Sequence, residues 1–320
     1  MESNVQSIAF GPVPSRRLGQ SLGINNIPPK ICSYSCLYCQ VGRTLKLQAA
    51  RRAFYDPQEI LREVRRKVDG ARQSNQQIDY LTFVSDGEPT LDISLGQAID
   101  LLRPLGIRIA VITNASLIWQ ADVRSDLARA DWVSVKVDSV DERIWRKVNR
   151  PYGPLRLDAI LNGITEFAES FRGEIATETM LINGFNDHTD AIQEVAGFLA
   201  QISPTRAYLS VPTRPPAEKR VQPPDAETLN RAYQILRKRL GNVEYLIGYE
   251  GNAFASTGDV EHDLLSITAV HPMRKDAVEL LLSKSGADWS AVQQLVSGHY
   301  LEEVEYDGFK FYVRKMPPRG

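Results

Sequence analysis

Most of the chain repeats the pattern of one stretch, Ile78-Asp-Tyr-Leu-Thr-Phe-Val84, which runs directly into Ser85-Asp86-Gly87-Glu88-Pro89. A short, nearly continuous apolar run predicts a buried β-strand, and the Gly and Pro after it predict a turn at its carboxyl end. Outward from this stretch, similar runs alternate with helical periodicity. Further strands are predicted at Ile107–Ile112, Trp132–Val137, Glu174–Ile182, Arg206–Val211 and Val243–Ile247, and helices at 57–68, 93–103, 118–129, 142–148, 157–169, 189–201 and 225–240.

Repeated strand–helix units of this kind imply a parallel sheet covered by helices. The predicted fold class is therefore α/β. The number of units favours a full or partial (β/α) barrel over a doubly wound sheet, although spacing alone does not separate the two. In either architecture the loops after the strands carry the functional site.

The pattern changes after about Gly251, which predicts two domains, residues 1–251 and residues 252–320. Asn252–Asp263 is predicted to be a linker. Two short helices, Arg274–Lys284 and Trp289–Val296, are followed by a hairpin with Asp307-Gly308 in a type I′ turn, and together they predict a small winged-helix-like module. Residues 270–320 contain 7 Lys/Arg and 7 Asp/Glu, a balance that does not favour nucleic acid as its partner.

The composition is that of an ordinary globular protein, with 43% hydrophobic and 24% charged residues in a chain of 320. We find no apolar run long enough to span a bilayer and no signal-peptide core, so a cytoplasmic location is the expectation. Residues 1–72 contain 12 Lys/Arg and 5 Asp/Glu, a local surplus that could serve an anionic substrate, phosphates or RNA. Four of these cations are instead predicted to form the solvated face of a helix: Arg62, Arg65, Arg66 and Lys67.

All three cysteines lie within eight positions, in Cys32-Ser-Tyr-Ser-Cys36-Leu-Tyr-Cys39. Three thiolates can bind three irons of a cubane cluster, which leaves the fourth iron open to an exogenous ligand. The alternatives are a structural zinc site and a chance grouping. Structural zinc requires four ligands, and the four histidines of the chain are distant in sequence from the cysteines.

The cysteine spacing, with Tyr38 as the aromatic residue before the last cysteine, resembles that of the radical S-adenosylmethionine (radical SAM) superfamily. The resemblance covers about residues 10–250. It implies a radical SAM-type barrel, a [4Fe–4S] cluster on the three cysteines, and S-adenosylmethionine as the ligand of the fourth iron. It also implies an external one-electron donor such as a flavodoxin or ferredoxin, because no cysteine remains for a second cluster.

The same resemblance implies which other residues contact S-adenosylmethionine. Asp86-Gly87-Glu88-Pro89 is similar to the Gly-Gly-Glu-Pro motif that holds the methionine amino group, and Asp86 replaces its first Gly. Polar residues at later strand ends suit the ribose and the carboxylate of the ligand. A further stretch, which includes Asn183 and Gly184, is similar to the one that lies against the adenine in the molybdenum-cofactor cyclase branch. These candidates are Asn114, Lys136, Asp138, Ser139, Asn183 and Gly184, and Tyr38 before the last cysteine is a further candidate contact. Each alone is also typical of a helix cap or turn, and it is their order along successive strand ends that favours one site.

Two groups of arginines have two interpretations. Arg16-Arg17 precedes the cysteines, and Arg214 lies near prolines after a strand. Each could clamp a carboxylate or phosphate, or hold a loop through backbone carbonyls. Their surroundings, residues 11–19 and 212–216, resemble an uncharacterised group sometimes placed with wyosine-type tRNA-modifying enzymes. Those enzymes need further cysteines, which this chain lacks, so their activity is not carried over.

Together these features predict a radical SAM oxidoreductase. It would cleave S-adenosylmethionine reductively, form a 5′-deoxyadenosyl radical and abstract hydrogen from a substrate that the sequence does not identify. The alternative is an iron–sulfur regulatory or binding protein that uses the C-terminal module for recognition.

Overall fold

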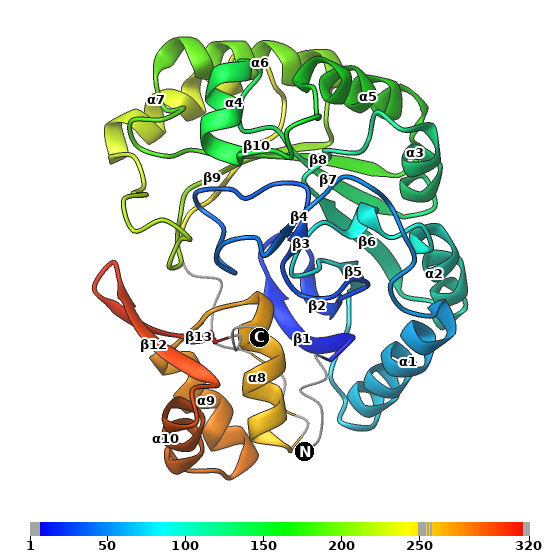
Figure 1. The fold of residues 1–320 in the computed structure, drawn as a ribbon, viewed down its shortest axis with the longest axis vertical. Helices are drawn as coiled ribbons and strands as arrows, with labels where there is room; N and C mark the ends of the chain where they lie inside the picture. Colours follow the sequence, from blue (N-terminus) through cyan, green and yellow to red (C-terminus); the bar gives the residue numbers. More distant parts are fainter. Residues whose placement is uncertain (1–6, 249–253, 255, 257, 316–320) are drawn as a thin grey trace.

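The computed structural model describes residues 7–248, 254, 256 and 258–315. Its centre is an eight-stranded sheet. Seven of its strands, β2 and β5 to β10, run parallel, and β1 pairs antiparallel with β2 at one edge. In sheet order the strands are β1 (Ala9–Ser15), β2 (Gly19–Ile24), β5 (Tyr80–Phe83), β6 (Arg108–Thr113), β7 (Trp132–Lys136), β8 (Glu174–Met180), β9 (Arg206–Ser210) and β10 (Val243–Leu246). The sheet curls into an open arc, which is a partial rather than a closed barrel (Figure 1).

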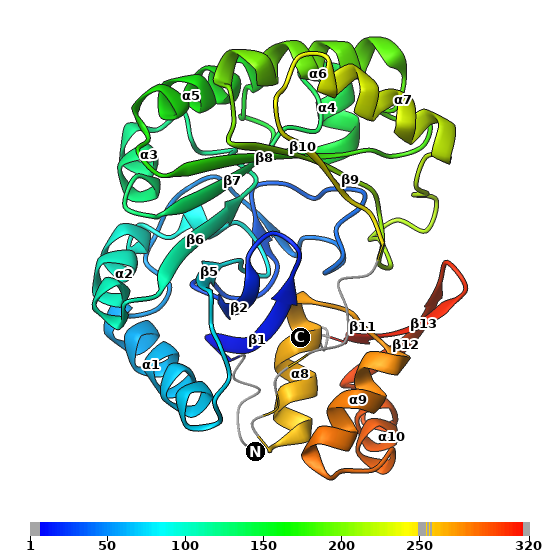
Figure 2. The ribbon, with the colours of Figure 1, turned by 180° about the vertical axis from the view of Figure 1, so that it is seen from behind.

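Helices cover the convex side of this arc (Figures 1 and 2). They are α1 (Pro57–Gln73), α2 (Leu95–Leu102), α3 (Ala121–Leu127), α5 (Leu157–Ser170), α6 (Thr189–Ile202) and α7 (Ala226–Arg237), while α4 (Glu142–Asn149) follows β7. The main core lies between these helices and the sheet and includes Phe83, Val111, Val133 and Phe167. One face of the sheet packs against the helices, and the concave face is also covered by the chain. Because both faces are covered, the strands appear in the sequence as near-continuous apolar runs.

The N-terminal hairpin of β1 and β2 was not predicted from the sequence, because Gly and Pro interrupt its apolar pattern. Between β2 and α1 the chain crosses the concave side of the arc and carries the cysteines (Figure 1). A short pair of parallel strands, β3 (Ile31–Cys32) and β4 (Lys46–Leu47), stiffens this cysteine loop. A 3-10 turn, Pro89–Leu91, follows β5.

The C-terminal module packs against β1, where Phe10 and Val13 join its apolar core. It consists of α8 (Val260–Val270), β11 (Met273–Arg274), α9 (Lys275–Ser285), α10 (Ser290–Ser297), β12 (Leu301–Tyr306) and β13 (Phe309–Arg314). The three strands form one sheet in the order β11-β13-β12, which gives a winged-helix outline. Asp307 and Gly308 have positive φ angles of 51° and 74°, as a type I′ turn requires.

Two expectations from the sequence were wrong. Residues predicted as the end of a linker belong to α8, which begins at Val260 behind Asp259, whose carboxylate accepts from the His262 backbone N–H. The start of that linker and the domain boundary at 251/252 lie outside the described residues. Lys67 is 7% exposed rather than solvated, because α8 packs near this part of α1. Burial lowers the pKa of Lys67, and the carboxylates of Asp259 and Asp263 counteract this effect.

Candidate active site

The three cysteines line one cavity of about 260 Å³ at the carboxyl edge of the sheet. Cys32 ends β3, and Cys36 and Cys39 follow in the loop. The end of α4 holds this loop in place: the backbone N–H of Ser35 donates to the carbonyl of Asn149 at 3.0 Å, and that of Leu37 to the carbonyl of Val148 at 2.9 Å. The loop therefore places all three cysteines, which lie close together along the chain, on the wall of one cavity.

Hydrogen-bond donors point at two of the sulfurs. The side-chain amide of Asn114 lies 3.5 Å from Cys32 Sγ, and that of Asn149 lies 3.5 Å from Cys36 Sγ. Burial raises the pKa of Cys36 to about 12 and that of Cys39 to about 11, so the free thiols hold their protons. Donors of this kind suit sulfurs that carry charge when they bind iron.

No group of three or more His, Cys, Asp or Glu side chains within the described ranges could hold a single metal ion. A cubane cluster does not require such a group, because each thiolate binds a different iron. The donor set, three cysteines with amide donors behind them, therefore fits a cluster with one iron free of protein ligands.

Gly87 brings the cysteine loop against the end of β5. A Cβ at this position would lie 1.9 Å from the carbonyl oxygen of Ile31, and the next backbone N–H, that of Glu88, donates to the same oxygen at 3.2 Å. Any side chain larger than hydrogen would push the two segments apart. Gly87 therefore allows the backbone of the cysteine loop to lie directly against the end of β5.

The two carboxylates on either side of Gly87 are in opposite situations. Asp86 is fully buried, lines the cavity, and has no hydrogen-bond partner for either carboxylate oxygen among the residues that the structure describes. Glu88 accepts from the hydroxyls of Thr90 and Thr113, each at 2.6 Å, and from the backbone N–H of Asn114 at 2.8 Å. Glu88 thus joins the ends of β5 and β6, whereas the Asp86 carboxylate makes no such connection among the described residues.

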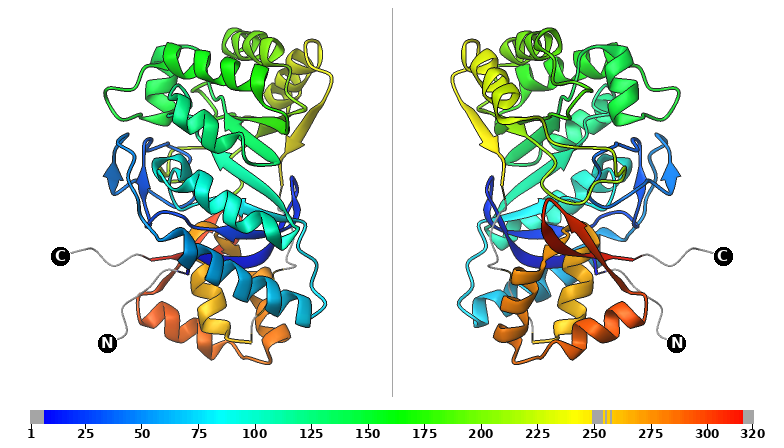
Figure 3. Two further views of the ribbon diagram at one scale, coloured as in Figure 1. Left: turned by 90° about the vertical axis from the view of Figure 1, so that its right-hand side faces the viewer. Right: turned by 90° about the vertical axis from the view of Figure 1, so that its left-hand side faces the viewer.

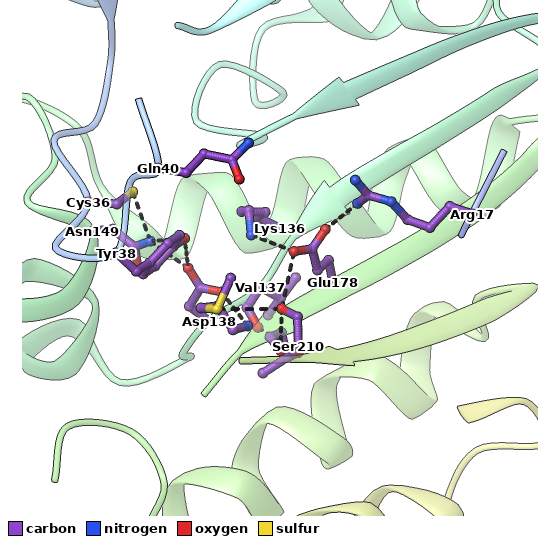
Figure 4. Close-up of polar contacts among 12 residues, drawn as sticks. Arg17, Cys36, Tyr38, Gln40, Lys136, Val137, Asp138, Asn149, Glu178 and Ser210 are labelled. Atoms are coloured by element: carbon purple, nitrogen blue, oxygen red, sulfur yellow. Dashed lines mark hydrogen bonds and ion pairs between the residues drawn. The ribbon is translucent and has the colours of Figure 1, made fainter. Parts of the chain in front are cut away.

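A charged network closes the other side of the cavity (Figure 4). Glu178 on β8 accepts from Lys136 Nζ at 2.9 Å and from the hydroxyl of Ser210 at 3.1 Å, and it pairs with Arg17 from the β1–β2 turn. Burial alone would raise the pKa of Glu178, but the Lys136 ammonium and the Arg17 guanidinium hold that pKa at about 2. Lys136 therefore stays charged and can offer its remaining N–H donors to a ligand.

Tyr38 forms the floor beside Cys36, and Asp138 holds it from behind (Figure 4). The hydroxyl of Tyr38 donates to the carboxylate of Asp138, which also accepts from the Asn149 amide at 2.7 Å and the Met180 backbone N–H at 2.9 Å. Asp138 is 4% exposed and lies behind the cavity wall. Its carboxylate orients Tyr38 and is already saturated with donors.

The other predicted residues lie around the cavity rather than in it. Pro89 is buried and opens the 3-10 turn after β5. Ser139 accepts from the Asp141 backbone N–H at 3.0 Å before α4. Asn183 and Gly184 are exposed in the turn after β8, outside the cavity lining. Of the proposed S-adenosylmethionine contacts, the structure brings four residues into the cavity wall: Tyr38, Asp86, Gly87 and Lys136.

The three arginines singled out in the sequence, Arg16, Arg17 and Arg214, line the cavity, and Arg16 and Arg214 also hold loops in place. Arg16 donates to the carbonyl of Ile247. Arg214 donates to the Gln40 side chain at 2.6 Å and lies 3.0 Å from His271 Nε2 of the C-terminal module.

Sequence reasoning missed Glu178 and Lys30, both in the cavity wall. Glu178 left a signal, since a carboxylate inside an apolar strand needs a cationic partner. That partner, Lys136, is its register neighbour on β7.

The comparisons with known proteins agree with this fold and site. A family model for the radical SAM superfamily matches residues 26–196. A UPF0026 protein of Methanocaldococcus jannaschii is 47% identical over 315 residues, which are 98% of each chain. This protein belongs to the radical SAM superfamily and is an enzyme of that superfamily.

Two solved structures share the fold at low identity. A radical SAM methyltransferase from Sphaerobacter thermophilus gives a TM-score of 0.54 at 19% identity and covers 73% of this chain and 69% of its own. The structure of TYW1 with a lysine–pyruvate adduct bound also gives a TM-score of 0.54, at 16% identity, and covers 70% of this chain and 76% of its own. Both support the curled half-barrel. None of the described helices has the length and apolar character needed to cross a membrane.

Proposed function

We propose that this enzyme cleaves S-adenosylmethionine reductively at a [4Fe–4S] cluster on Cys32, Cys36 and Cys39 and acts on an anionic substrate. The single observation that carries the proposal is the shared cavity of the three thiols and the unpartnered, fully buried carboxylate of Asp86. Burial raises the pKa of Asp86, against the opposing effect of Lys30, and a buried carboxylate without a hydrogen-bond partner is costly unless a ligand completes it.

The ends of the cavity suit the two ends of an amino acid. Asp86 can accept from the methionine ammonium, and Lys136 can donate to a carboxylate or ribose oxygen. Lys136 Nζ also lies 5.0 Å from the centre of the Tyr38 ring, which helps to fix its position. Asn114 acts from behind, through Cys32 and through Ser33, whose hydroxyl lies 3.0 Å from its amide.

When bound, the reduced cluster and S-adenosylmethionine supply a 5′-deoxyadenosyl radical that can abstract hydrogen. The residues of the chain position the reactants and exclude water. Tyr38, held by Asp138, forms a fixed floor, and Glu178 keeps Lys136 charged and orients both Lys136 and Arg17. Cys32, Cys36 and Cys39 must each lose a proton when they bind iron.

The charge of the cavity favours an anionic substrate. Six cations and two carboxylates line it, an excess of 6 − 2 = 4 positive charges. The cluster with its thiolates and S-adenosylmethionine carry opposite net charges of about one each, so they leave this excess in place. The cations are Arg16, Arg17, Lys30, Arg43, Lys136 and Arg214. A carboxylate or phosphate on the substrate would meet them.

The test is anaerobic reconstitution, followed by dithionite and S-adenosylmethionine, with 5′-deoxyadenosine as the measured product. The wild type should form it, and Cys36→Ala should lose it together with bound iron. Asp86→Asn should keep its iron but bind S-adenosylmethionine roughly 10- to 100-fold more weakly, since a charged hydrogen bond contributes about 1.5–3 kcal/mol. Asp69→Asn, an exposed carboxylate on α1, is the matched control. Absence of product with an intact cluster, or unchanged binding in Asp86→Asn, would contradict the proposal.

A further inference from the structure

The segment Gly42–Gln48 forms the outer wall of the cysteine loop. It begins and ends with a backbone hydrogen bond to a cysteine: the N–H of Gly42 donates to the carbonyl of Cys39 at 3.1 Å, and the N–H of Gln48 to the carbonyl of Cys32 at 3.0 Å. Within it, β4 pairs in parallel with β3, so that Leu47 is the register partner of Cys32. Figure 3 shows this blue segment standing out from the face of the sheet.

The exposed side chains of this segment include both apolar and cationic groups. Leu45 is 66% exposed and Leu47 38% exposed, although β4 is paired with β3. The Arg43 side chain is 71% exposed, and Lys46 is exposed between the two leucines. We call these four residues the β4 face. Exposed leucines on an ordered backbone, with cations beside them, are typical of a contact surface.

The chain segment that carries the β4 face has more positive than negative charge. Residues 3–55 contain seven Lys/Arg and no Asp or Glu. In the fold, Glu218 contacts the edge of this segment through Arg43, at 2.9 Å. Such an imbalance attracts an acidic partner over several ångströms and speeds its association.

We propose that the β4 face is the docking surface for an acidic one-electron donor protein. The inference rests on the proposed function, since it requires a cluster on the three cysteines. All three cysteines of the chain are used there, so the electron must enter from outside. A donor on the β4 face is separated from Cys32 by a single strand. Two leucines and two cations also suit the small interfaces of transient electron-transfer complexes.

The step itself is a simple electron transfer. The reduced donor loses one electron, the oxidised cluster gains it, and no covalent bond forms or breaks. The donor then leaves, which a small and salt-sensitive interface allows.

The experiment uses the cluster-loaded enzyme and photoreduced flavodoxin, with a reduced ferredoxin as a second donor. Stopped-flow absorbance measures the rate of cluster reduction, and a fluorescence titration measures donor affinity. Lys46→Glu should slow reduction about tenfold at low ionic strength, with a smaller effect at high salt, and Leu45→Ser should slow it severalfold. Arg65→Glu on α1 and Leu280→Ser on α9 are matched exposed controls and should match the wild type. Dithionite, which needs no docking surface, should reduce all variants equally.

The outcomes separate this inference from the proposed function. If flavodoxin reduces the cluster of Lys46→Glu more slowly than that of the wild type, docking is supported. If neither the wild type nor any variant then forms 5′-deoxyadenosine, the proposed activity is refuted. Equal rates and affinities for Lys46→Glu, Leu45→Ser and their controls would overturn docking while leaving the activity intact. If Lys46→Glu instead weakens binding of an RNA hairpin and leaves donor reduction unchanged, the β4 face is a nucleic-acid surface and the proposal is wrong.

Discussion

The carbonyl oxygen of Ile31 occupies the space in which a side chain at Gly87 would begin, 1.9 Å from the position of its Cβ. This contact joins two segments that are more than fifty residues apart. It sets the cysteine loop directly against the end of β5. The relative position of the thiols and Asp86 therefore depends on the absence of a Cβ at Gly87.

Gly87→Ala should consequently displace the cysteine loop while the helices and sheet remain folded. We expect the variant to retain little iron after reconstitution and to form at most a few per cent of the wild-type 5′-deoxyadenosine. Circular dichroism and iron analysis provide the measurement. A variant with full iron content and activity would show that the loop can move aside at no cost.

Gly70→Ala is the matched control and should stabilise the protein. Gly70 lies inside α1, has no positive φ, and a Cβ there would meet nothing within 4 Å. Alanine in a helix interior is favoured over glycine by about 0.5–1 kcal/mol. Urea unfolding should show this gain with unchanged iron content, and a loss of stability would contradict the prediction.

Asn114→Ala should make the reduction potential of the cluster more negative. The amide of Asn114 lies 3.5 Å from Cys32 Sγ. Hydrogen bonds to cluster sulfurs stabilise the electron-rich reduced state, so that their loss disfavours reduction. A redox titration followed by electron paramagnetic resonance measures the shift. Asn242→Ala, at an exposed position before β10, should leave the potential unchanged, and an equal shift in both variants would refute the role of Asn114.

Glu178→Gln should lower the free energy of unfolding at pH 7 by about 3 kcal/mol, because Lys136 and Arg17 lose their buried counter-charge. The folded-state pKa of Glu178, about 2, is below its ordinary value of 4.5. Its contribution is therefore complete above about pH 4.5 and is lost as the pH falls toward 2. Urea unfolding from pH 7 to pH 3.5 should show the difference between variant and wild type shrinking below about pH 4.5. Glu166→Gln, which breaks an exposed pair with Arg124, should cost less than about 1 kcal/mol.

Much of the barrel was predictable because its signals are local. Asp56 accepts from the Gln58 backbone N–H at 2.9 Å and caps α1, as the Asp-Pro pair at its start indicated. The strands of the barrel after the cysteines appear within a few residues of their predicted ends. The N-terminal hairpin was missed, because its strands carry Gly and Pro and are held by pairing with β5 and by the apolar core of the C-terminal module.

The candidate site divides in the same way. The sequence by itself determined the three-thiol set and the turn after β5, since closely spaced cysteines and a Gly-Glu-Pro turn depend on neighbours along the chain. Tertiary structure decided which polar residues meet the cavity. It saturated Glu88 and Asp138 with donors, left Asp86 without a partner among the described residues, and paired Lys136 with Glu178 across 42 positions. The physical reason is that the cost of a buried charge depends on the groups around it, and those groups are brought together only when the sheet curls around the cysteine loop.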